Sequence, residues 1–345
     1  MLELKKPPKL NSGDRVAAVS LSWGGAGDDE TRWRYEQGKQ RLEDLFGLEV
    51  VEMPNTLKGS AYLYENPQKR AEDLMQAFSD RKIKAIFSCI GGNDSIRLLP
   101  FINYDIIRNN PKIFCGYSDT TVTHYMCLKA GVSSFYGPAI LTDFAENITM
   151  PEYTFDAVRK TLFDSAVVGE IQPSPSWTSE RLDWIIENKS RARKFYPNRR
   201  YELIQGKSKV QGRLIGGCTE VLALIRGTSL FPTFDCFDEA ILFLETCEEL
   251  PPPWFIEDEL RCYGTMGLLN RINGIFWAKP MGETYHAEYK QVIVKVLKEF
   301  GCSELSVLYN GSFGHNEPKT MLPYGALAEI DCENRSFSIL ESGVI

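Results

Sequence analysis

The stretch Pro111-Lys-Ile-Phe-Cys-Gly-Tyr-Ser-Asp-Thr-Thr121 decides the fold of the first half of the chain. A short apolar run leads into Gly116, and after Ser118 the pattern becomes that of a helix over residues 119–129. The same alternation occurs upstream, with strands predicted over 15–20, 48–53 and 83–88 and helices over 31–46 and 67–78. Strands that alternate with helices pair in parallel, with helices on both faces of the sheet. The sequence therefore predicts an open α/β domain.

The domain organisation follows from the length and from a change in composition. A chain of 345 residues exceeds the usual size of one core, so two domains are expected. The segment 166–210 holds three prolines, two tryptophans and a dense charged stretch, which is typical of a linker or a long functional loop. We predict a nucleophile-bearing domain over 1–165, a linker or substrate loop over 166–210, and a second, mixed α/β domain over 211–345 that closes with strands over 325–331 and 336–341.

Composition and charge limit the possible partners. The chain is 43% hydrophobic and 25% charged, which fits a soluble globular protein. With 39 basic and 46 acidic residues the net charge is −7, which disfavours nucleic-acid binding. No apolar run approaches the roughly 20 residues that span a bilayer, and the N-terminus lacks the apolar core of a signal peptide. We therefore expect a cytoplasmic protein without a nucleic-acid or membrane partner.

Cysteine and histidine usage argues against disulfides and metals. The nine cysteines are odd in number and form no CxxC pair, so we expect reduced, mostly buried thiols. The three histidines are His124, His286 and His315, and none is spaced with cysteines as in a zinc site. No metal or organic cofactor is expected.

Ser118 is the candidate nucleophile. A serine between a strand and a helix stands at the carboxyl end of the parallel sheet, where α/β proteins place ligands. The helix start also presents free N–H groups that favour negative charge on a substrate oxygen. This is the logic of a nucleophile elbow, although the GxSxG pattern is absent. The alternative is that Ser118 or Asp119 caps the helix.

The glycine pair Gly91-Gly92 follows the preceding strand. Two glycines let the backbone approach a ligand closely, and they would lie beside Ser118 if the two strands are neighbours. The N–H groups of Gly92 and Asp119 could then form an oxyanion hole, and Gly91 and Asn93 are expected to contact the substrate. The alternative is an ordinary glycine turn.

A serine nucleophile needs a base, and His315 is the best candidate. It lies in the glycine-rich loop Asn310-Gly-Ser-Phe-Gly-His315, after a predicted strand. Glu245 ends the apolar strand 240–244, where an unpaired carboxylate would be costly and a histidine would be a suitable partner. We expect a site in the cleft between the two domains.

Taken together, these segments resemble the LD-carboxypeptidase family of serine peptidases. The matching pieces run in order over nearly the whole chain: Gly13-Asp14, Gly91-Gly92, Gly116-Tyr-Ser-Asp119, Tyr136-Gly-Pro138, Gly212-Arg-Leu-Ile-Gly-Gly217, Phe243-Leu-Glu245, Gly314-His315 and Leu322-Pro323. The resemblance implies that Ser118, Glu245 and His315 form a catalytic triad. It also implies a class I glutamine amidotransferase-like first domain, a swivelling, barrel-like second domain, and a homodimer.

Within this family, the amino-acid sequences of the segments 90–100 and 116–131 most resemble the branch of microcin C immunity proteins, MccF. That branch cleaves an acidic aminoacyl group from a sulfamoyl or phosphoramidate adenosine, with tryptophans of the middle segment stacked on adenine. Here Trp177 and Trp184 are seven residues apart and would share one face of a helix, although packing of the loop is the alternative. Cys218 stands where asparagine is expected in many relatives.

Two other functions fit the same sequence. A murein tetrapeptide LD-carboxypeptidase of cell-wall recycling would keep the triad and would not require the tryptophan segment. A protein that sequesters an adenylate without turnover would not depend on Ser118. The small-molecule substrate is thus expected to be an aminoacyl nucleotide or a peptide.

Overall fold

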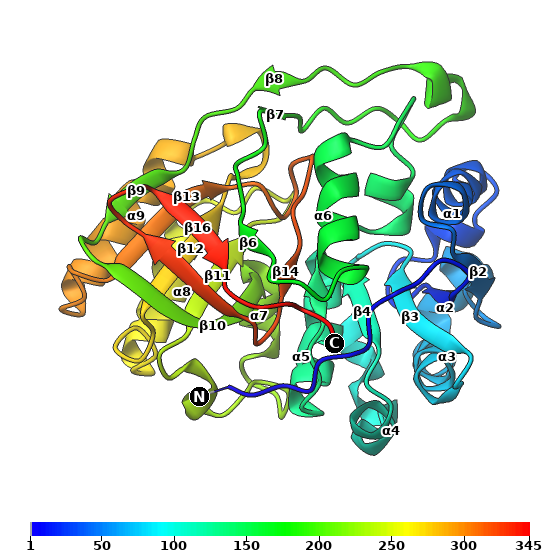
Figure 1. Ribbon diagram of the computed structural model, residues 1–345, viewed down its shortest axis with the longest axis horizontal. Coiled ribbons are helices and arrows are strands. Elements are labelled where there is room, and N and C mark those ends of the chain that lie inside the picture. The colour runs from blue at the N-terminus through cyan, green and yellow to red at the C-terminus, as the bar shows by residue number, and fades with distance from the viewer. Residues whose placement is uncertain (1) are drawn as a thin grey trace.

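The computed structural model describes residues 2–345, and two sheets organise them (Figure 1). The strands are β1 (Arg15–Val19), β2 (Glu49–Glu52), β3 (Ile83–Ser88), β4 (Ile113–Gly116), β5 (Phe135–Tyr136), β6 (Gly169–Glu170), β7 (Ser176–Trp177), β8 (Tyr196–Pro197), β9 (Glu202–Gln205), β10 (Lys209–Cys218), β11 (Ile241–Glu245), β12 (Gly274–Ala278), β13 (Ser306–Gly311), β14 (Leu322–Pro323), β15 (Leu327–Asp331) and β16 (Ser336–Ile339). The helices are α1 (Arg32–Phe46), α2 (Ser60–Glu65), α3 (Pro67–Ser79), α4 (Tyr104–Asn109), α5 (Thr121–Lys129), α6 (Glu152–Leu162), α7 (Thr219–Ile225), α8 (Pro253–Thr265) and α9 (His286–Glu299).

The first sheet has the order β14-β5-β4-β3-β1-β2, and β2, β1, β3, β4 and β5 are parallel. Both of its faces are buried, as the alternation along β1 shows. Val16 packs in the same cluster as Phe46 of α1, whereas Ala17 packs in the cluster that contains Leu74 of α3. A strand covered on both sides must be apolar throughout, which explains the continuous runs in the sequence.

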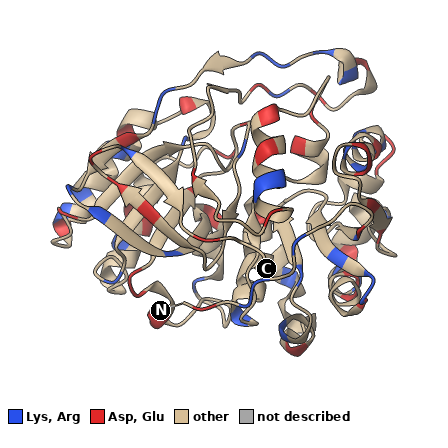
Figure 2. Cartoon of the chain, in the orientation of Figure 1, with Lys and Arg blue, Asp and Glu red and all other residues tan. Residues whose placement is uncertain are grey.

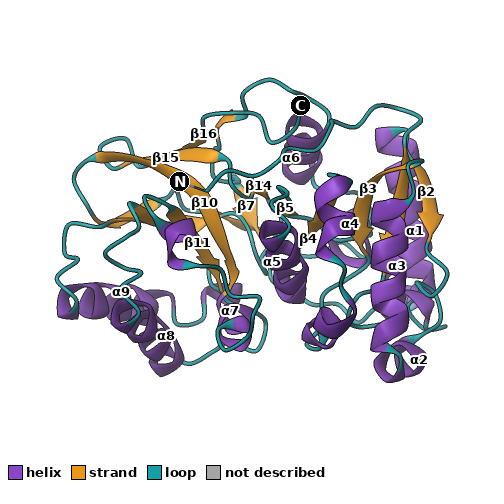
Figure 3. Ribbon diagram, turned by 90° about the horizontal axis from the view of Figure 1, so that it is seen from below, coloured by secondary structure: helices purple, strands orange, loops and turns teal. Residues whose placement is uncertain are grey.

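The second sheet has the order β6-β16-β15-β10-β11-β12-β13-β9. Its centre, β10 to β13, is parallel, and its outer strands pair antiparallel. Figure 3 shows α7, α8 and α9 together on one side of this sheet. The predicted closing pair of strands is confirmed as the antiparallel pair β15 and β16.

The chain crosses between the two halves more often than the sequence indicates. Strands β6 and β9 of the segment 166–210 belong to the second sheet, and β14 of the C-terminal part pairs with β5 of the first. The division at residues 165 and 210 therefore remains a prediction. The rest of the segment, with β7 and β8, runs along one edge of the molecule over both halves (Figure 1).

Three further features bear on the sequence predictions. No helix within residues 2–345 is long and apolar enough to cross a membrane. Acidic and basic residues are interspersed over both halves in the view of Figure 2. All nine cysteines are free.

Candidate active site

Ser118 follows β4 after one intervening residue, Tyr117, in a tight turn, Ser118–Thr120, that leads into α5. Its φ of 63° lies in the left-handed region, which is unusual for a residue with a side chain and is typical of a strained nucleophile turn. Its Oγ lies 3.0 Å from Nε2 of His315. The turn has no side-chain cap, so the alternative that Ser118 or Asp119 caps the helix is wrong.

His315 and Glu245 complete a chain of hydrogen bonds that begins at Ser118. His315 Nδ1 lies 2.7 Å from Oε2 of Glu245, and both side chains are buried. Glu245 ends β11 in the second sheet, whereas Ser118 follows β4 in the first. The two sheets thus bring together the three residues that the sequence singles out.

Tyr136 ties this chain together from β5. Its hydroxyl donates to the second oxygen of Glu245, Oε1, at 2.5 Å, and it accepts the backbone N–H of Ser118 at 3.0 Å. One buried hydroxyl therefore positions both the turn of the serine and the carboxylate behind the histidine. Sequence reasoning missed this role, although Tyr136 stands in the matching segment Tyr136-Gly-Pro138.

Glu248 is a second carboxylate at the histidine, and sequence reasoning missed it. Its Oε2 lies 2.9 Å from Nε2 of His315, the same nitrogen that faces Ser118. Burial alone would lower the pKa of His315, but Glu245 and the hydrogen bond to Glu248 outweigh it and raise that pKa well above its ordinary value. The hydrogen bond from His315 lowers the pKa of Glu248 to about 2.

The glycine loop after β3 lies beside the serine, since β3 and β4 are neighbours. A Cβ on Gly91 would lie 3.0 Å from Cβ of Ser118 and 3.3 Å from the backbone nitrogen of Asp119. A larger residue here would press against Ser118, so glycine suits this close approach. The Asp119 carboxylate accepts the N–H of Ser95 at 2.9 Å, so the Asp119 side chain has a partner of its own and its backbone N–H is the group available to an oxyanion.

A cavity of about 880 Å³ opens at Ser118 and takes residues from both halves of the chain. Its lining includes every residue predicted for the site except Glu245, which lies behind His315, and Trp177. The lining residues near the serine and the middle segment include Gly91, Gly92, Asn93, Ser118, Asp119, Glu180, Arg181, Trp184, Arg193, Cys218, Glu220, Cys247, Glu248, Glu249, His315 and Glu317. This volume suits a ligand of drug-like or nucleotide size.

Aromatic and cationic groups gather at one end of the cavity. The rings of Trp184 and Trp23 lie 5.9 Å apart and are tilted by 31°, and the Arg34 guanidinium lies 4.6 Å from the centre of the Trp184 ring. Such faces stack on bases of any sequence. Sequence reasoning missed Trp23, although it follows β1 at the same carboxyl edge of the sheet where ligands are expected.

Trp177 lies elsewhere, and the prediction that it shares a helix face with Trp184 is wrong. Trp177 ends β7, where its ring lies 5.8 Å from that of Tyr196 and 4.7 Å from the Lys279 ammonium. The segment is not helical because the next residue, Thr178, exchanges backbone hydrogen bonds with Glu317 instead. The geometry of Trp177 corresponds to the packing alternative.

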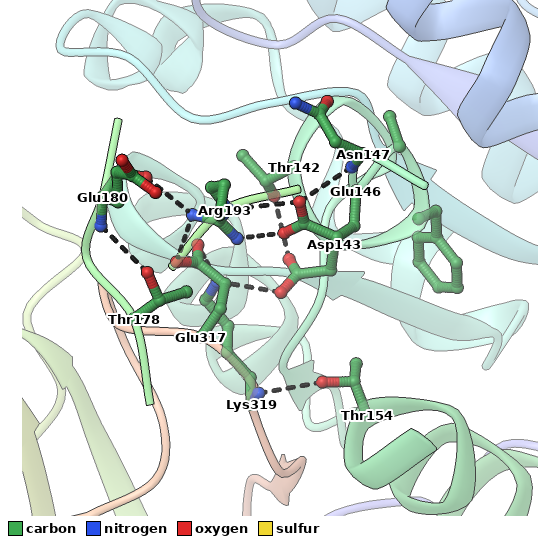
Figure 4. Close-up of polar contacts among 12 residues, drawn as sticks. Thr142, Asp143, Glu146, Asn147, Thr154, Thr178, Glu180, Arg193, Glu317 and Lys319 are labelled. Atoms are coloured by element: carbon green, nitrogen blue, oxygen red, sulfur yellow. Dashed lines mark hydrogen bonds and ion pairs between the residues drawn. The ribbon is translucent and has the colours of Figure 1, made fainter. Parts of the chain in front are cut away.

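A buried ionic network fastens the middle segment to the body of the protein (Figure 4). Arg193 of that segment pairs with Glu146 and, at 3.0 Å, with Glu317. Lys319 pairs with Glu317 at 2.8 Å and with Asp143 at 2.9 Å. Burial alone would raise the pKa of Glu317, but Lys319 and Arg193 outweigh it and lower that pKa to about 2. The network thus places the wall that carries Trp184.

The other candidate ligands have structural partners. The His124 ring is buried between Ser134 and the Gly116 carbonyl, each at 2.9 Å, and burial lowers its pKa to about 3. His286 starts α9 and is buried. Within residues 2–345, one group has metal-ligand geometry, with ligand atoms within 4.8 Å of one another: Cys218, Glu220 and Cys247.

The fold and the serine–histidine–glutamate geometry define a hydrolase-type α/β protein. Residues 16–137 match the model of the LD-carboxypeptidase N-terminal domain, and residues 211–330 match the C-terminal domain. The chain belongs to this family of serine peptidases. It is 30% identical to the Escherichia coli microcin C7 self-immunity protein MccF over 89% of this chain and 88% of that one. It is 27% identical to a Bacillus subtilis protein named "probable murein peptide carboxypeptidase", over 98% and 95%.

Solved structures confirm the predicted mixed α/β fold in two domains. An MccF-like protein from Streptococcus pneumoniae in complex with AMP matches with a TM-score of 0.87 and 34% identity, over 95% of this chain and 98% of that one. MccF in complex with aspartyl sulfamoyl adenosine matches with a TM-score of 0.86 and 26% identity, over 99% and 100%. The family and the neighbourhood of MccF, both predicted from sequence, are thereby confirmed.

Proposed function

We propose that the chain is a serine hydrolase that cleaves the bond between an aminoacyl group and an adenosine-type leaving group, as in detoxification of processed microcin C. The observation that carries the proposal is the Ser118–His315–Glu245 chain of hydrogen bonds, which opens on a cavity that Trp184 and Arg34 also line. MccF-type relatives with AMP or aspartyl sulfamoyl adenosine bound support it.

In the proposed mechanism, Ser118 Oγ attacks the acyl carbon while neutral His315 accepts its proton at Nε2. Glu245 orients the imidazole and stabilises its charged form. The N–H groups of Gly92 and Asp119 hold the oxyanion. His315 then returns the proton to the leaving nitrogen, and a water activated by the same histidine hydrolyses the acyl-enzyme.

The lining of the cavity supports one orientation of the substrate. Trp184, Trp23 and Arg34 favour an aromatic base and an anionic linkage, because aromatic faces stack on bases and a guanidinium attracts the anion. The acyl group then lies on the side of the second domain. The resemblance to MccF implies an acidic acyl group, such as aspartyl or glutamyl.

The second candidate is a murein tetrapeptide LD-carboxypeptidase. The B. subtilis relative named for that substrate favours it, and the triad geometry would serve equally well. A peptide that ends in D-alanine carries no base, so it would have no use for the tryptophan pair.

The experiment presents the purified protein with an aminoacyl sulfamoyl-adenosine and, separately, with a murein tetrapeptide, and both are followed by mass spectrometry. Release of sulfamoyl-adenosine supports the proposal, whereas loss of D-alanine alone supports the second candidate. Ser118→Ala should lower turnover by several orders of magnitude. Stoichiometric protection without turnover, unaffected by Ser118→Ala, would point to sequestration.

Two further predictions stand on resemblance or composition alone. The protein is proposed to act in the cytoplasm and as a homodimer. Light scattering on the purified protein measures the second directly, and a monomeric mass would contradict it.

A further inference from the structure

Carboxylates dominate the acyl end of the cavity. Glu220 lies in the first turn of α7, and Glu248 and Glu249 follow β11, so all three border the cavity on the side of the second domain. Arg181 pairs with Glu248, at 3.5 Å, and its side chain is 59% exposed. The other two arginines of the lining, Arg34 and Arg193, are engaged at the tryptophan end and in the buried network.

Glu220 differs from the other two because it is partly buried. Its Oε1 accepts the N–H of Cys247 at 2.9 Å, and Cys218 Sγ lies 3.4 Å from Oε2. Glu248 and Glu249 are exposed and line the cavity. An acidic acyl side chain would enter this region against like charge, while a cation would find oxygen ligands on two sides.

Glu248 also contacts Nε2 of His315, the nitrogen that accepts the serine proton in the proposed mechanism. Nε2 of His315 can accept from Ser118 only when it carries no proton, whereas its contact with Glu248 requires an N–H. Acceptance of the Ser118 proton and donation to Glu248 are therefore mutually exclusive at Nε2. Without a substrate, Glu248 favours the protonated histidine, which is the inactive form for attack.

We propose that Glu220, Glu248 and Glu249 form a subsite for a positively charged aminoacyl side chain, so that the preferred substrate carries a basic or neutral aminoacyl group in place of the acidic one that the resemblance to MccF implies. This rests on the proposed function. An ammonium group bound by Glu248 draws that carboxylate from His315. The Nε2 proton then passes to water at the open cavity mouth, and Ser118 gains its base.

Several charged and polar groups around His315 affect the loss of its Nε2 proton. Glu245 faces Nδ1 from β11, Glu248 faces Nε2 from the turn beyond it, and the Tyr117 ring packs against the imidazole with its centre 5.1 Å away. Lys319 stands behind Tyr117, 4.3 Å from the ring centre. Of these groups, Glu248 is the one that is both exposed and in contact with Nε2, so it is the one a substrate can reach.

The test compares three sulfamoyl-adenosines that differ only in the acyl group: lysyl, leucyl and aspartyl. We expect kcat/KM for the lysyl compound to exceed that for the aspartyl compound by about tenfold or more, with leucyl between, because exchanging an attractive charge near 4 Å for a repulsive one changes the interaction by about twice the energy of a single pair in water. Glu249→Gln should shrink the lysyl-to-aspartyl ratio several-fold. Glu333→Gln, an exposed acid in the turn between β15 and β16, is the matched control and should leave the ratio unchanged.

The outcomes separate the inference from the proposed function. Cleavage with an aspartyl preference overturns the inference and leaves the function standing. If no compound is cleaved, the proposed function fails, and calorimetry with Ser118→Ala still decides the inference: tighter binding of the lysyl compound supports the carboxylate subsite, and equal or tighter binding of the aspartyl compound overturns it. Thermal melts confirm that the variants are folded.

Discussion

Glu248→Gln should move the acid limb of the pH–activity profile to lower pH. The change replaces a carboxylate, 2.9 Å from Nε2 of His315, by a neutral amide of the same shape, while Glu245 stays in place. The pKa of His315 is raised in the native protein, so its neutral, basic form is reached only as the pH rises through that value. Without the charge of Glu248 that pKa falls, and the basic form persists to lower pH.

The size of the shift follows from distance and exposure. Two unit charges at about 4 Å interact by about 1 kcal/mol in water and about 4 kcal/mol at an effective dielectric constant of 20. Because Glu248 is 39% exposed and shares its charge with Arg181, the lower part of this range applies, roughly 1–2 kcal/mol. That corresponds to about one pH unit in the pKa of His315.

The assay is kcat/KM between pH 5 and 9, because its limbs report the pKa values of the free enzyme. The leucyl sulfamoyl-adenosine avoids a titrating side chain in the substrate. Glu249→Gln removes a neighbouring charge that has no contact with Nε2 in the structure. It should therefore shift the acid limb by only a fraction of the shift expected for Glu248→Gln. An acid limb that stays in place, or moves to higher pH, in Glu248→Gln would refute the reasoning.

Three other predictions follow from single contacts. Trp184→Ala should weaken binding of AMP by roughly 1–3 kcal/mol in calorimetry, whereas Trp177→Ala, outside the cavity, should not. Tyr136→Phe should lower kcat with little change in KM, since it leaves two buried groups of the site unpaired at about 1–3 kcal/mol; an unchanged kcat would contradict this. Arg193→Gln should reduce the free energy of unfolding in urea by up to roughly 3–5 kcal/mol, because it leaves buried Glu146 without its ion partner and Glu317 with Lys319 alone, while exposed Arg200→Gln should change it little.

The first sheet could be predicted because its strands and helices each leave a pattern in a short stretch of sequence. Parallel strands covered on both faces must be continuous apolar runs, and the helices between them have amphipathic periodicity. Helix α1 was expected over 31–46 and spans Arg32–Phe46. Helix α8 was not among the predicted elements: three consecutive prolines precede and begin it, and Pro253 is tolerated only because it occupies the first turn.

The position of Ser118 could also be predicted, since the end of a parallel strand is a place that topology defines. The neighbours of His315 could not. Glu248 reaches it through the turn after β11, and no local pattern in that turn distinguishes a carboxylate in the site from one in solvent. Trp177 shows the converse: spacing alone suggested a shared face, and backbone pairing of Thr178 with Glu317 overrode it.

The carboxylates of the cavity affect two properties of the enzyme, the preference for an acyl group and the pH dependence of activity, and Glu248 affects both. Glu249 borders the cavity without touching the histidine, so its replacement should change the choice of acyl group and leave the pH profile nearly unaltered. Glu248 does both, because it faces the acyl group and shares Nε2 with Ser118. A change at Glu248 that relaxes the preference for a cationic acyl group must therefore also extend activity to lower pH. If the two effects appeared separately in Glu248→Gln, the carboxylate would not be acting on the histidine, and the subsite would be one of charge attraction alone.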